Sequence, residues 1–221
     1  MEWEIFYCNY FFVIIKRFRW LLFISMIFCQ SIVTDITRDT DGNISNIEYF
    51  NTSFKKVQLI KMETYYPNGQ ISSLEMFANG VKNGQHQEFY DNGKLKMDGH
   101  FKDGDEIGLW TEYYSTGEVM RMYYADKYGL NGSLNEWYEN GEKKVSGVYN
   151  EGQKHGVWIS WFANGLKKSM VTYKNGVMEG VFMFYYENGT KKSEGTVNYK
   201  GQKEERCWDS DGVVQNCKGK E

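Results

Sequence analysis

The chain has 221 residues, of which 17% are aromatic, and it contains 23 glycines but a single proline. Such an aromatic content excludes a disordered tail or a solvated linker, because disordered chains are poor in aromatic residues. The formal net charge of −3 gives no basis for nucleic-acid binding through a global positive charge, and four cysteines are too few for a disulfide-dense scaffold.

Residues 1–31 have the composition of a signal peptide or an N-terminal anchor. The basic cluster Lys16-Arg17-Phe18-Arg19 is followed by an apolar run from Trp20 to Phe28 and then by small polar residues. This run is shorter than the roughly 20 residues that cross a bilayer. We therefore expect export to the periplasm, the cell surface or the medium, with cleavage after Ser31.

A second apolar segment, from Ile5 to Ile15, lies ahead of the basic cluster, which is unusual for a signal peptide. Two alternatives account for it: a true start near residues 13–16, or a membrane anchor retained through residues 1–31. In the second case the chain would contact a membrane only through this uncleaved leader.

Residues 32–60 show no clear repeat. Asp41-Gly42-Asn43 resembles a turn, but Gly42 lies 27 residues before Gly69 and is out of phase with the units that follow. We therefore predict an irregular N-terminal cap over residues 32–60.

A repeat of 24 residues occupies residues 61–204, in six copies. Two sets of glycines recur at this spacing, and aromatic or apolar residues fill fixed columns four and seven residues before the first set. The first set is Gly69, Gly93, Gly117, Gly141, Gly165 and Gly189, and the second is Gly84, Gly108, Gly132, Gly156 and Gly180. The columns are Tyr65, Phe89, Tyr113, Trp137, Trp161 and Tyr185, and Met62, His86, Trp110, Leu134, Trp158 and Phe182.

The segments between these glycines are rich in Tyr, Trp, Phe and Val and alternate apolar with polar residues, which is typical of strands. Asn-Gly between such segments is a strong hairpin signal because both residues tolerate positive φ, and the second set of glycines predicts the turn at the other end. The fold class is therefore all-β: an elongated single-layer antiparallel meander of β-hairpin repeats.

Residues 205–221 form a truncated unit, predicted to be a C-terminal capping hairpin. Asp211-Gly212 should turn the chain and bring Cys207 and Cys217 onto adjacent strands. A two-residue turn would pair Cys207 with Asn216, so a bulge or a longer loop is needed for the sulfurs to meet. We predict a disulfide between the two cysteines; the alternative is two free thiols, which suits a reducing compartment.

No catalytic, cofactor-binding or metal-binding motif is present in the sequence. His86, His100 and His155 lack close ligand spacing, and no nucleophile elbow, phosphate loop or dinucleotide fingerprint occurs. A carboxylate column could suggest a glycosidase, but a solvated ladder paired with lysines explains it better. Its members are Glu88, Glu112 and Glu136.

Lysine pairs follow three consecutive turns and should line one edge of the sheet. They are either a basic strip for an acidic partner or lipid headgroups, or a device that keeps exposed strands soluble. With four tryptophans they form the candidate partner-binding set: Lys143, Lys144, Lys167, Lys168, Lys191, Lys192, Trp110, Trp137, Trp158 and Trp161.

The unit Gly-x-Trp-x-x-Tyr-Tyr-x-x-Gly, as in residues 108–117, resembles the MORN-repeat variant family, which includes antitoxins of the YwqK type. The resemblance covers residues 61–217. It implies an elongated array of β-hairpins that serves as an interaction surface, with no catalytic residues attached to the motif.

These observations predict a non-enzymatic, exported repeat protein, without cofactor, that is a monomer and binds another protein. A YwqK-like antitoxin that neutralises a toxin is the narrower version. The alternative is a module that binds cell-surface glycan or lipid headgroups, since exposed aromatic rings stack on sugars.

Overall fold

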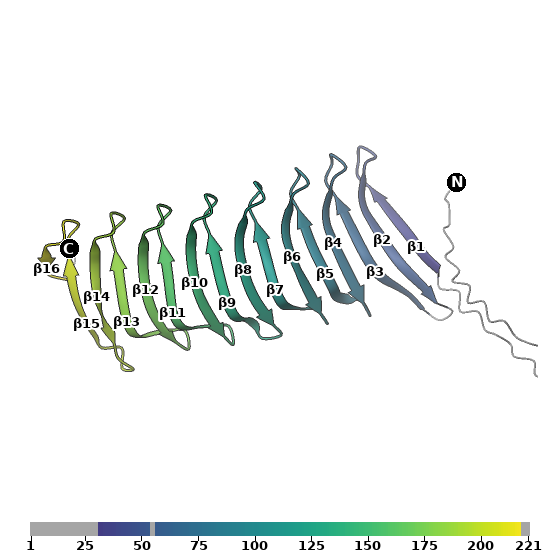
Figure 1. Cartoon of the computed structure of the whole chain (residues 1–221). Coiled ribbons are helices and arrows are strands. Elements are labelled where there is room, and N and C mark those ends of the chain that lie inside the picture. The colour runs from purple at the N-terminus through teal and green to yellow at the C-terminus, as the bar shows by residue number, and fades with distance from the viewer. Residues whose placement is uncertain (1–30, 54–55, 218–221) are drawn as a thin grey trace, which may run out of the picture.

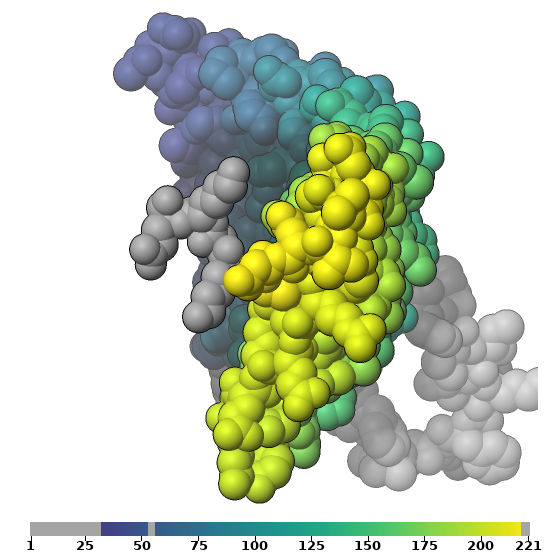
Figure 2. Space-filling view, turned by 90° about the vertical axis from the view of Figure 1, so that its left-hand side faces the viewer, coloured from purple at the N-terminus to yellow at the C-terminus, as the bar shows by residue number. Residues whose placement is uncertain are grey.

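The computed structural model describes residues 31–53 and 56–217 as one sheet of sixteen antiparallel strands in sequence order (Figure 1). The strands are β1 (Ser31–Arg38), β2 (Ile44–Ser53), β3 (Lys56–Tyr65), β4 (Ile71–Ala78), β5 (Val81–Phe89), β6 (Leu95–Lys102), β7 (Asp105–Tyr113), β8 (Val119–Asp126), β9 (Gly129–Trp137), β10 (Lys143–Asn150), β11 (Gln153–Trp161), β12 (Lys167–Lys174), β13 (Val177–Tyr185), β14 (Lys191–Val197), β15 (Lys203–Trp208) and β16 (Val214–Gln215). Figure 2 looks along this row with the C-terminal hairpin nearest the viewer. The all-β meander of hairpins predicted from the repeat is confirmed.

The predicted leader lies outside the described residues, apart from Ser31 at the start of β1. Within the described ranges no helix is long and apolar enough to cross a bilayer.

Residues 32–53 and 56–60, expected to be an irregular cap, instead form β1, β2, the loop between them and the first half of β3, and these strands pair antiparallel with one register shift in each ladder. The loop between β1 and β2 is ordered by Asp39, whose carboxylate accepts hydrogen bonds from the backbone N–H groups of Asp41 and Asn43, both at 2.9 Å. The loop has the same backbone hydrogen bonds as the Asn-Gly loops, from Asp39 N–H to Asn43 and from Gly42 N–H to Asp39. Its glycine is out of phase because β2 and β3 have 10 residues each, whereas β4 has 8 and β5 has 9.

The Asn-Gly turns are three-residue loops in which glycine alone has positive φ. In the loop after β5, Gly93 has φ +79° and donates to the carbonyl of Tyr90, while the Tyr90 N–H donates to the carbonyl of Lys94. Asn92 is absent from the positive-φ residues of the described chain. The predicted reason for asparagine, tolerance of positive φ, is therefore wrong at these turns.

The opposite edge of the sheet carries two-residue turns, but not at the glycines that the sequence indicated. Asn79-Gly80 makes the first of them, with φ +52° and +82°, as a type I′ turn requires. Gly84, predicted to mark this turn, lies four residues later inside β5, where the register with β4 shifts. The second set of glycines therefore marks bulges within strands.

The core of this single sheet is a row of side chains on one face, contributed by every second strand from β5 to β13. His86, Trp110, Leu134, Trp158 and Phe182 are all at most 6% exposed, and we call them the core column. They are the residues that stand seven positions before the turn glycines, so the predicted column is the core.

The strands between those of the core column place their own residues opposite it. Three of these residues are glycines, spaced 48 residues apart: Gly99, Gly147 and Gly195. A Cβ atom at Gly99 would lie 2.2 Å from the Trp110 ring, and one at Gly147 would lie 2.2 Å from the Trp158 ring. These glycines are therefore required by close packing rather than by backbone conformation. The pattern of residues that pack against the core column therefore recurs every 48 residues, which is two repeats.

Candidate functional site

Two of the four candidate tryptophans belong to the core. Trp110 has no exposed surface and meets Phe101 edge to face at 5.1 Å between ring centroids. Trp158 is 6% exposed and meets Tyr149 in the same way at 5.0 Å. Buried rings reach no partner, so Trp110 and Trp158 do not belong to a binding surface.

His86 occupies the same column and also packs rather than binding a ligand. Its ring meets Phe101 edge to face at 5.3 Å. Its two nitrogens lie 3.5 Å from carboxylate oxygens of Glu75 and Glu88, respectively. The imidazole thus ends the aromatic column in a polar cluster.

The carboxylate column is paired, but unevenly. Glu88 contacts Lys96 at 2.8 Å and Glu136 contacts Lys144 at 3.5 Å, whereas Glu112 is buried and pairs with Arg121. Burial is the largest single influence on the pKa of Glu88 and would raise it, but the hydrogen bond and charge of Lys96 together with His86 outweigh burial and hold the pKa below its ordinary value. A paired ladder explains these glutamates, with arginine in place of lysine at the buried position.

The remaining candidates alternate along one row near the Asn-Gly edge. Backbone pairing places each lysine directly opposite an aromatic residue: Lys143 opposite Trp137, Lys167 opposite Trp161, and Lys191 opposite Tyr185. The Nζ of Lys143 also lies 5.9 Å from the ring centre of Trp161 in the next repeat. We call these six residues the lysine–aromatic row.

The second lysine of each pair contacts the aromatic residue of the adjacent loop. Lys144 lies over Tyr138 at 6.0 Å, Lys168 over Phe162 at 5.7 Å, and Lys192 over Tyr186 at 5.5 Å. Lys168 and Lys192 line a shallow pocket of about 470 Å³ between successive loops. The six lysines therefore form two sets in different surroundings, and not one strip.

A row of exposed apolar side chains crosses the face opposite the core. Each member directly precedes a core-column residue or follows a residue that lies opposite that column on the neighbouring strand, so strand alternation turns it to the other face. Exposed fractions run from 40% to 50%. The members, which we call the open-face strip, are Leu109, Tyr124, Val148, Val157 and Val181.

Sequence reasoning missed this strip, although the signal is present. The strip occupies the positions adjacent to the core column, and valine and leucine there have no role in the core. Its neighbours in the same row, Ser133, Thr172 and Thr196, are uncharged, and they pair with Val148, Val157 and Val181. An uncharged strip thus extends over β7–β14.

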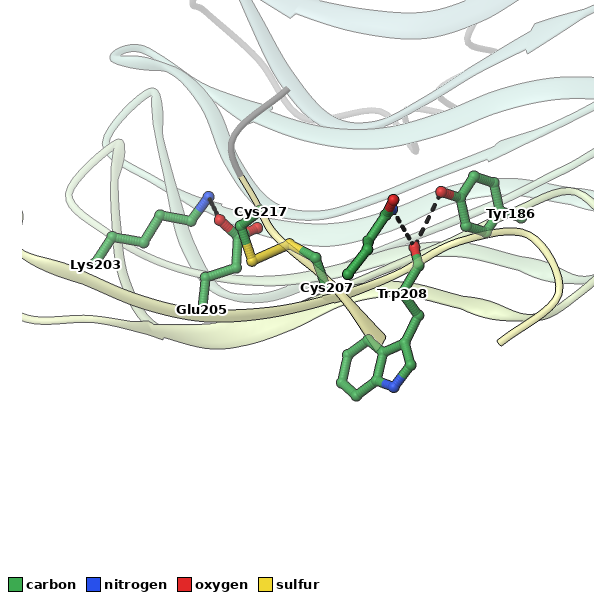
Figure 3. Close-up of a disulfide and its surroundings, with 7 residues drawn as sticks. Tyr186, Lys203, Glu205, Cys207, Trp208 and Cys217 are labelled. Carbon is green, nitrogen blue, oxygen red and sulfur yellow. Dashed lines mark hydrogen bonds and ion pairs between the residues drawn. A yellow bond between two sulfur atoms is a disulfide. The ribbon is translucent and has the colours of Figure 1, made fainter. Parts of the chain in front are cut away.

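The terminal hairpin contains the predicted disulfide between Cys207 and Cys217, with Cα atoms 5.1 Å apart (Figure 3). The turn is a three-residue loop with the same backbone hydrogen bonds as the Asn-Gly loops, and Cys207 pairs with Gln215 instead of Asn216. Cys217, two residues beyond, is therefore reached diagonally. The Trp208 carbonyl accepts hydrogen bonds from Tyr186 and Gln215, which ties this hairpin to the preceding repeat.

The fold and the 24-residue units define the class: a repeat protein built from consecutive β-hairpins. Four of its segments match the MORN repeat variant family, at residues 59–79, 82–103, 154–175 and 178–199. The chain belongs to the MORN-repeat variant proteins.

Other comparisons add little. A search of curated proteins gave no match. One similar solved structure is the crystal structure of a protein with unknown function from Bacteroides fragilis NCTC 9343, at 7% identity. The match covers 85% of this chain and 90% of that chain, with a TM-score of 0.16, which carries no argument about function.

Proposed function

We propose that this chain is a non-enzymatic, exported scaffold that binds another protein through the face opposite its core. The observation that carries this proposal is the open-face strip, which exposes Val148, Val157 and Val181 next to uncharged neighbours. A quarter of the chain is charged, so an uncharged strip across eight strands is unusual surface. Extended apolar patches of this kind are typical of protein interfaces.

The lysine–aromatic row supports a partner that has acidic residues at the rim of its interface. Lys143 and Lys167 are exposed and lie beside half-buried aromatic rings, an arrangement that presents charge above an apolar base. Equivalent lysines recur in every second strand, roughly 10 Å apart. Rim charges of this kind act mainly on the association rate and the choice of partner.

Export is supported by the leader and by the disulfide between Cys207 and Cys217, since disulfides persist in oxidising compartments. N-terminal sequencing of protein from native cells should then begin near Ile32. A YwqK-like antitoxin is the narrower form of the proposal, with a toxin as the partner. Glycan binding has less support, because two of the four candidate tryptophans are buried.

The test compares surface variants in one affinity-purification experiment from native cells. Val148→Asp with Val157→Asp should remove the captured protein, because two charges would be desolvated at the centre of the strip. Val213→Asp is the matched control: it adds a charge at an apolar residue of 61% exposure in the terminal loop, away from the strip. Circular dichroism checks that each variant retains its strands.

The same proteins are applied to a glycan array and to vesicles with anionic headgroups. Capture that survives the double substitution, or binding only to glycan or lipid, would overturn the proposal. Loss of capture with Lys143→Glu and Lys167→Glu, together with a weaker salt dependence, would place the acidic rim of the partner at the lysine–aromatic row.

A further inference from the structure

The terminal hairpin brings two cysteines and one glutamate together on one face. Glu205 and Cys207 are two residues apart on β15, so their side chains point the same way. Cys217 follows β16 and reaches the same place (Figure 3). Both sulfur atoms and a Glu205 oxygen lie within 4.8 Å of one another. Over residues 31–53 and 56–217, this is the one group of His, Cys, Asp and Glu side chains gathered tightly enough to hold an ion.

In the disulfide form these sulfur atoms are bonded to each other, and thiolates are the metal ligands that cysteine supplies. We propose that reduction converts the terminal hairpin into a zinc site made of Cys207, Cys217 and Glu205. A thiol or phosphine reductant supplies two electrons, the S–S bond breaks, and two protons give two thiols. Zn²⁺ then binds both sulfurs and displaces these two protons to solvent.

The geometry permits this exchange without moving the strands. Zinc–sulfur bonds of about 2.3 Å in a tetrahedron place two sulfurs about 3.8 Å apart. Cα atoms separated by 5.1 Å allow that spacing through rotation of the two side chains. Glu205 supplies the third ligand and leaves the fourth position to water, which is the pattern of three protein ligands and one open position.

The surroundings favour a metal held by these three groups. Cys207 is 8% exposed, so little water competes around its sulfur. Lys203 contacts one oxygen of the Glu205 carboxylate at 2.7 Å, which holds the side chain in place. Thiolates with a carboxylate are a set that suits Zn²⁺ rather than Ca²⁺ or Mg²⁺, whose ligands are oxygen atoms.

Such a site would close the hairpin in both redox states. β16 has two residues and pairs only with β15, so backbone pairing alone gives this end of the sheet little support. The disulfide would hold the end in an oxidising compartment, and the metal would hold it before oxidation or after reduction. This inference concerns the terminal hairpin and does not depend on the proposed partner surface.

The test uses the full chain with Cys8→Ser and Cys29→Ser, so that Cys207 and Cys217 are the only thiols. The protein is titrated with Co²⁺, before and after reduction by a phosphine. We expect one equivalent of Co²⁺ to bind only after reduction, with thiolate-to-cobalt charge-transfer absorption in the near ultraviolet, and Zn²⁺ to displace it. Zn²⁺ should also raise the melting temperature of the reduced protein and leave that of the oxidised protein unchanged.

Glu205→Gln should weaken Co²⁺ binding at least about tenfold. Glu204→Gln, which removes the same charge from the adjacent exposed residue of β15, should not. Glu205→His restores a ligand and should restore tight binding, which separates a lost ligand from a damaged fold. Equal Co²⁺ binding in both redox states, no charge-transfer absorption, or equal effects of Glu204→Gln and Glu205→Gln would overturn the proposal.

Discussion

A tyrosine in five of the six repeat loops bonds one repeat to the next. Its hydroxyl donates to the carbonyl at the end of the equivalent strand one repeat later, as from Tyr138 to Trp161 at 2.9 Å. The other donors of this kind are Tyr66, Tyr90, Tyr114 and Tyr186. Phe162 occupies the same column and has no hydroxyl to donate to the carbonyl of Tyr185.

Phe162→Tyr should therefore stabilise the protein. The added hydroxyl completes the series of inter-repeat bonds, and one such bond contributes about 0.5–1.5 kcal/mol. Urea unfolding should show a higher midpoint with an unchanged slope. Tyr138→Phe is the matched opposite and should lower the midpoint by a similar amount; a lower midpoint for both variants would contradict this account.

Glu88 gives a pH dependence that can be assigned to one residue. Burial would raise its pKa, but the hydrogen bond and charge of Lys96 together with His86 outweigh burial, so the pKa in the folded protein lies below the ordinary value of 4.5. A lowered folded pKa contributes stability above the unfolded value, and this contribution is lost as the pH falls through the folded value. The effect belongs to acidic pH and is small, since the pair is partly exposed.

Glu88→Gln should thus lower the urea midpoint at pH 7 and have less effect at an acidic pH such as pH 3, because the wild-type carboxylate gains a proton as the pH falls through its folded pKa. The measurement is a pair of urea curves at the two pH values. Glu139→Gln, in an exposed loop, serves as the control and should change neither curve. A difference between Glu88→Gln and wild type that grows on acidification would show that the sign is wrong.

At the scale of the elements, the Asn-Gly loops are linked to one another by their asparagines. The Oδ1 of Asn140 accepts from the backbone N–H of Glu142 at 3.1 Å, and its Nδ2 donates to the carbonyl of Ala163 in the next loop at 2.8 Å. The same two bonds recur in the other loops that contain asparagine at this position. In the loop between β7 and β8, Thr116 stands there instead.

Thr116→Asn should add the missing pair of bonds, to the N–H of Glu118 and the carbonyl of Glu139. We expect a gain of about 0.5–1.5 kcal/mol, partly offset by the contact that Thr116 makes with Glu118. Asn140→Thr should cost a similar amount. Chemical denaturation measures the change in the free energy of unfolding for the two variants. No change for Asn140→Thr would mean that the asparagine hydrogen bonds between loops contribute nothing to stability.

At the scale of the whole molecule, the sheet is one-dimensional: each strand pairs only with its neighbours in sequence. Stability then depends on each hairpin and on its junctions. The junctions are not all equivalent, because Trp110 packs on Gly99 and Trp158 packs on Gly147. A repeat can therefore replace another that lies 48 residues away in the sequence, but not its neighbour 24 residues away.

Deletions at the two-residue turns test this packing period. Removing residues 105–152 places Trp158 beside Gly99, which reproduces a native junction. Removing residues 129–152 places Trp158 beside Tyr123, where no space exists for the ring. The larger deletion should therefore give the more cooperative unfolding curve and the higher urea midpoint.

Adding Tyr123→Gly to the smaller deletion should rescue it, because a glycine again lies beneath Trp158. Far-UV circular dichroism and urea unfolding provide the readout. A smaller deletion that is as stable as the larger one, with no gain from Tyr123→Gly, would show that the 24-residue unit is the true packing period.

The sequence by itself determined the class of this protein and the order of its hairpins, and its repeat contains the column that the structure shows to be the core. A constant period places equivalent residues at equivalent positions, so the column of His86, Trp110 and Phe182 had to fall on one face. Alternation within strands also carries the signal for the open-face strip, which was recognised only in the structure. The disulfide also followed from the truncated last unit, because a turn at Asp211-Gly212 brings its two cysteines together.

Only the tertiary structure decided which glycines turn the chain and which tryptophans are accessible. Gly84 and Gly80 are both glycines near a strand end, and the register between β4 and β5 makes one a bulge and the other a turn. Trp137 and Trp158 occupy different columns of the repeat, and the structure separates them: Trp158 is buried, whereas Trp137 is half-buried. Within residues 32–60 the structure pairs β1 with β2 and β2 with β3, although this segment lacks the 24-residue pattern of the later strands.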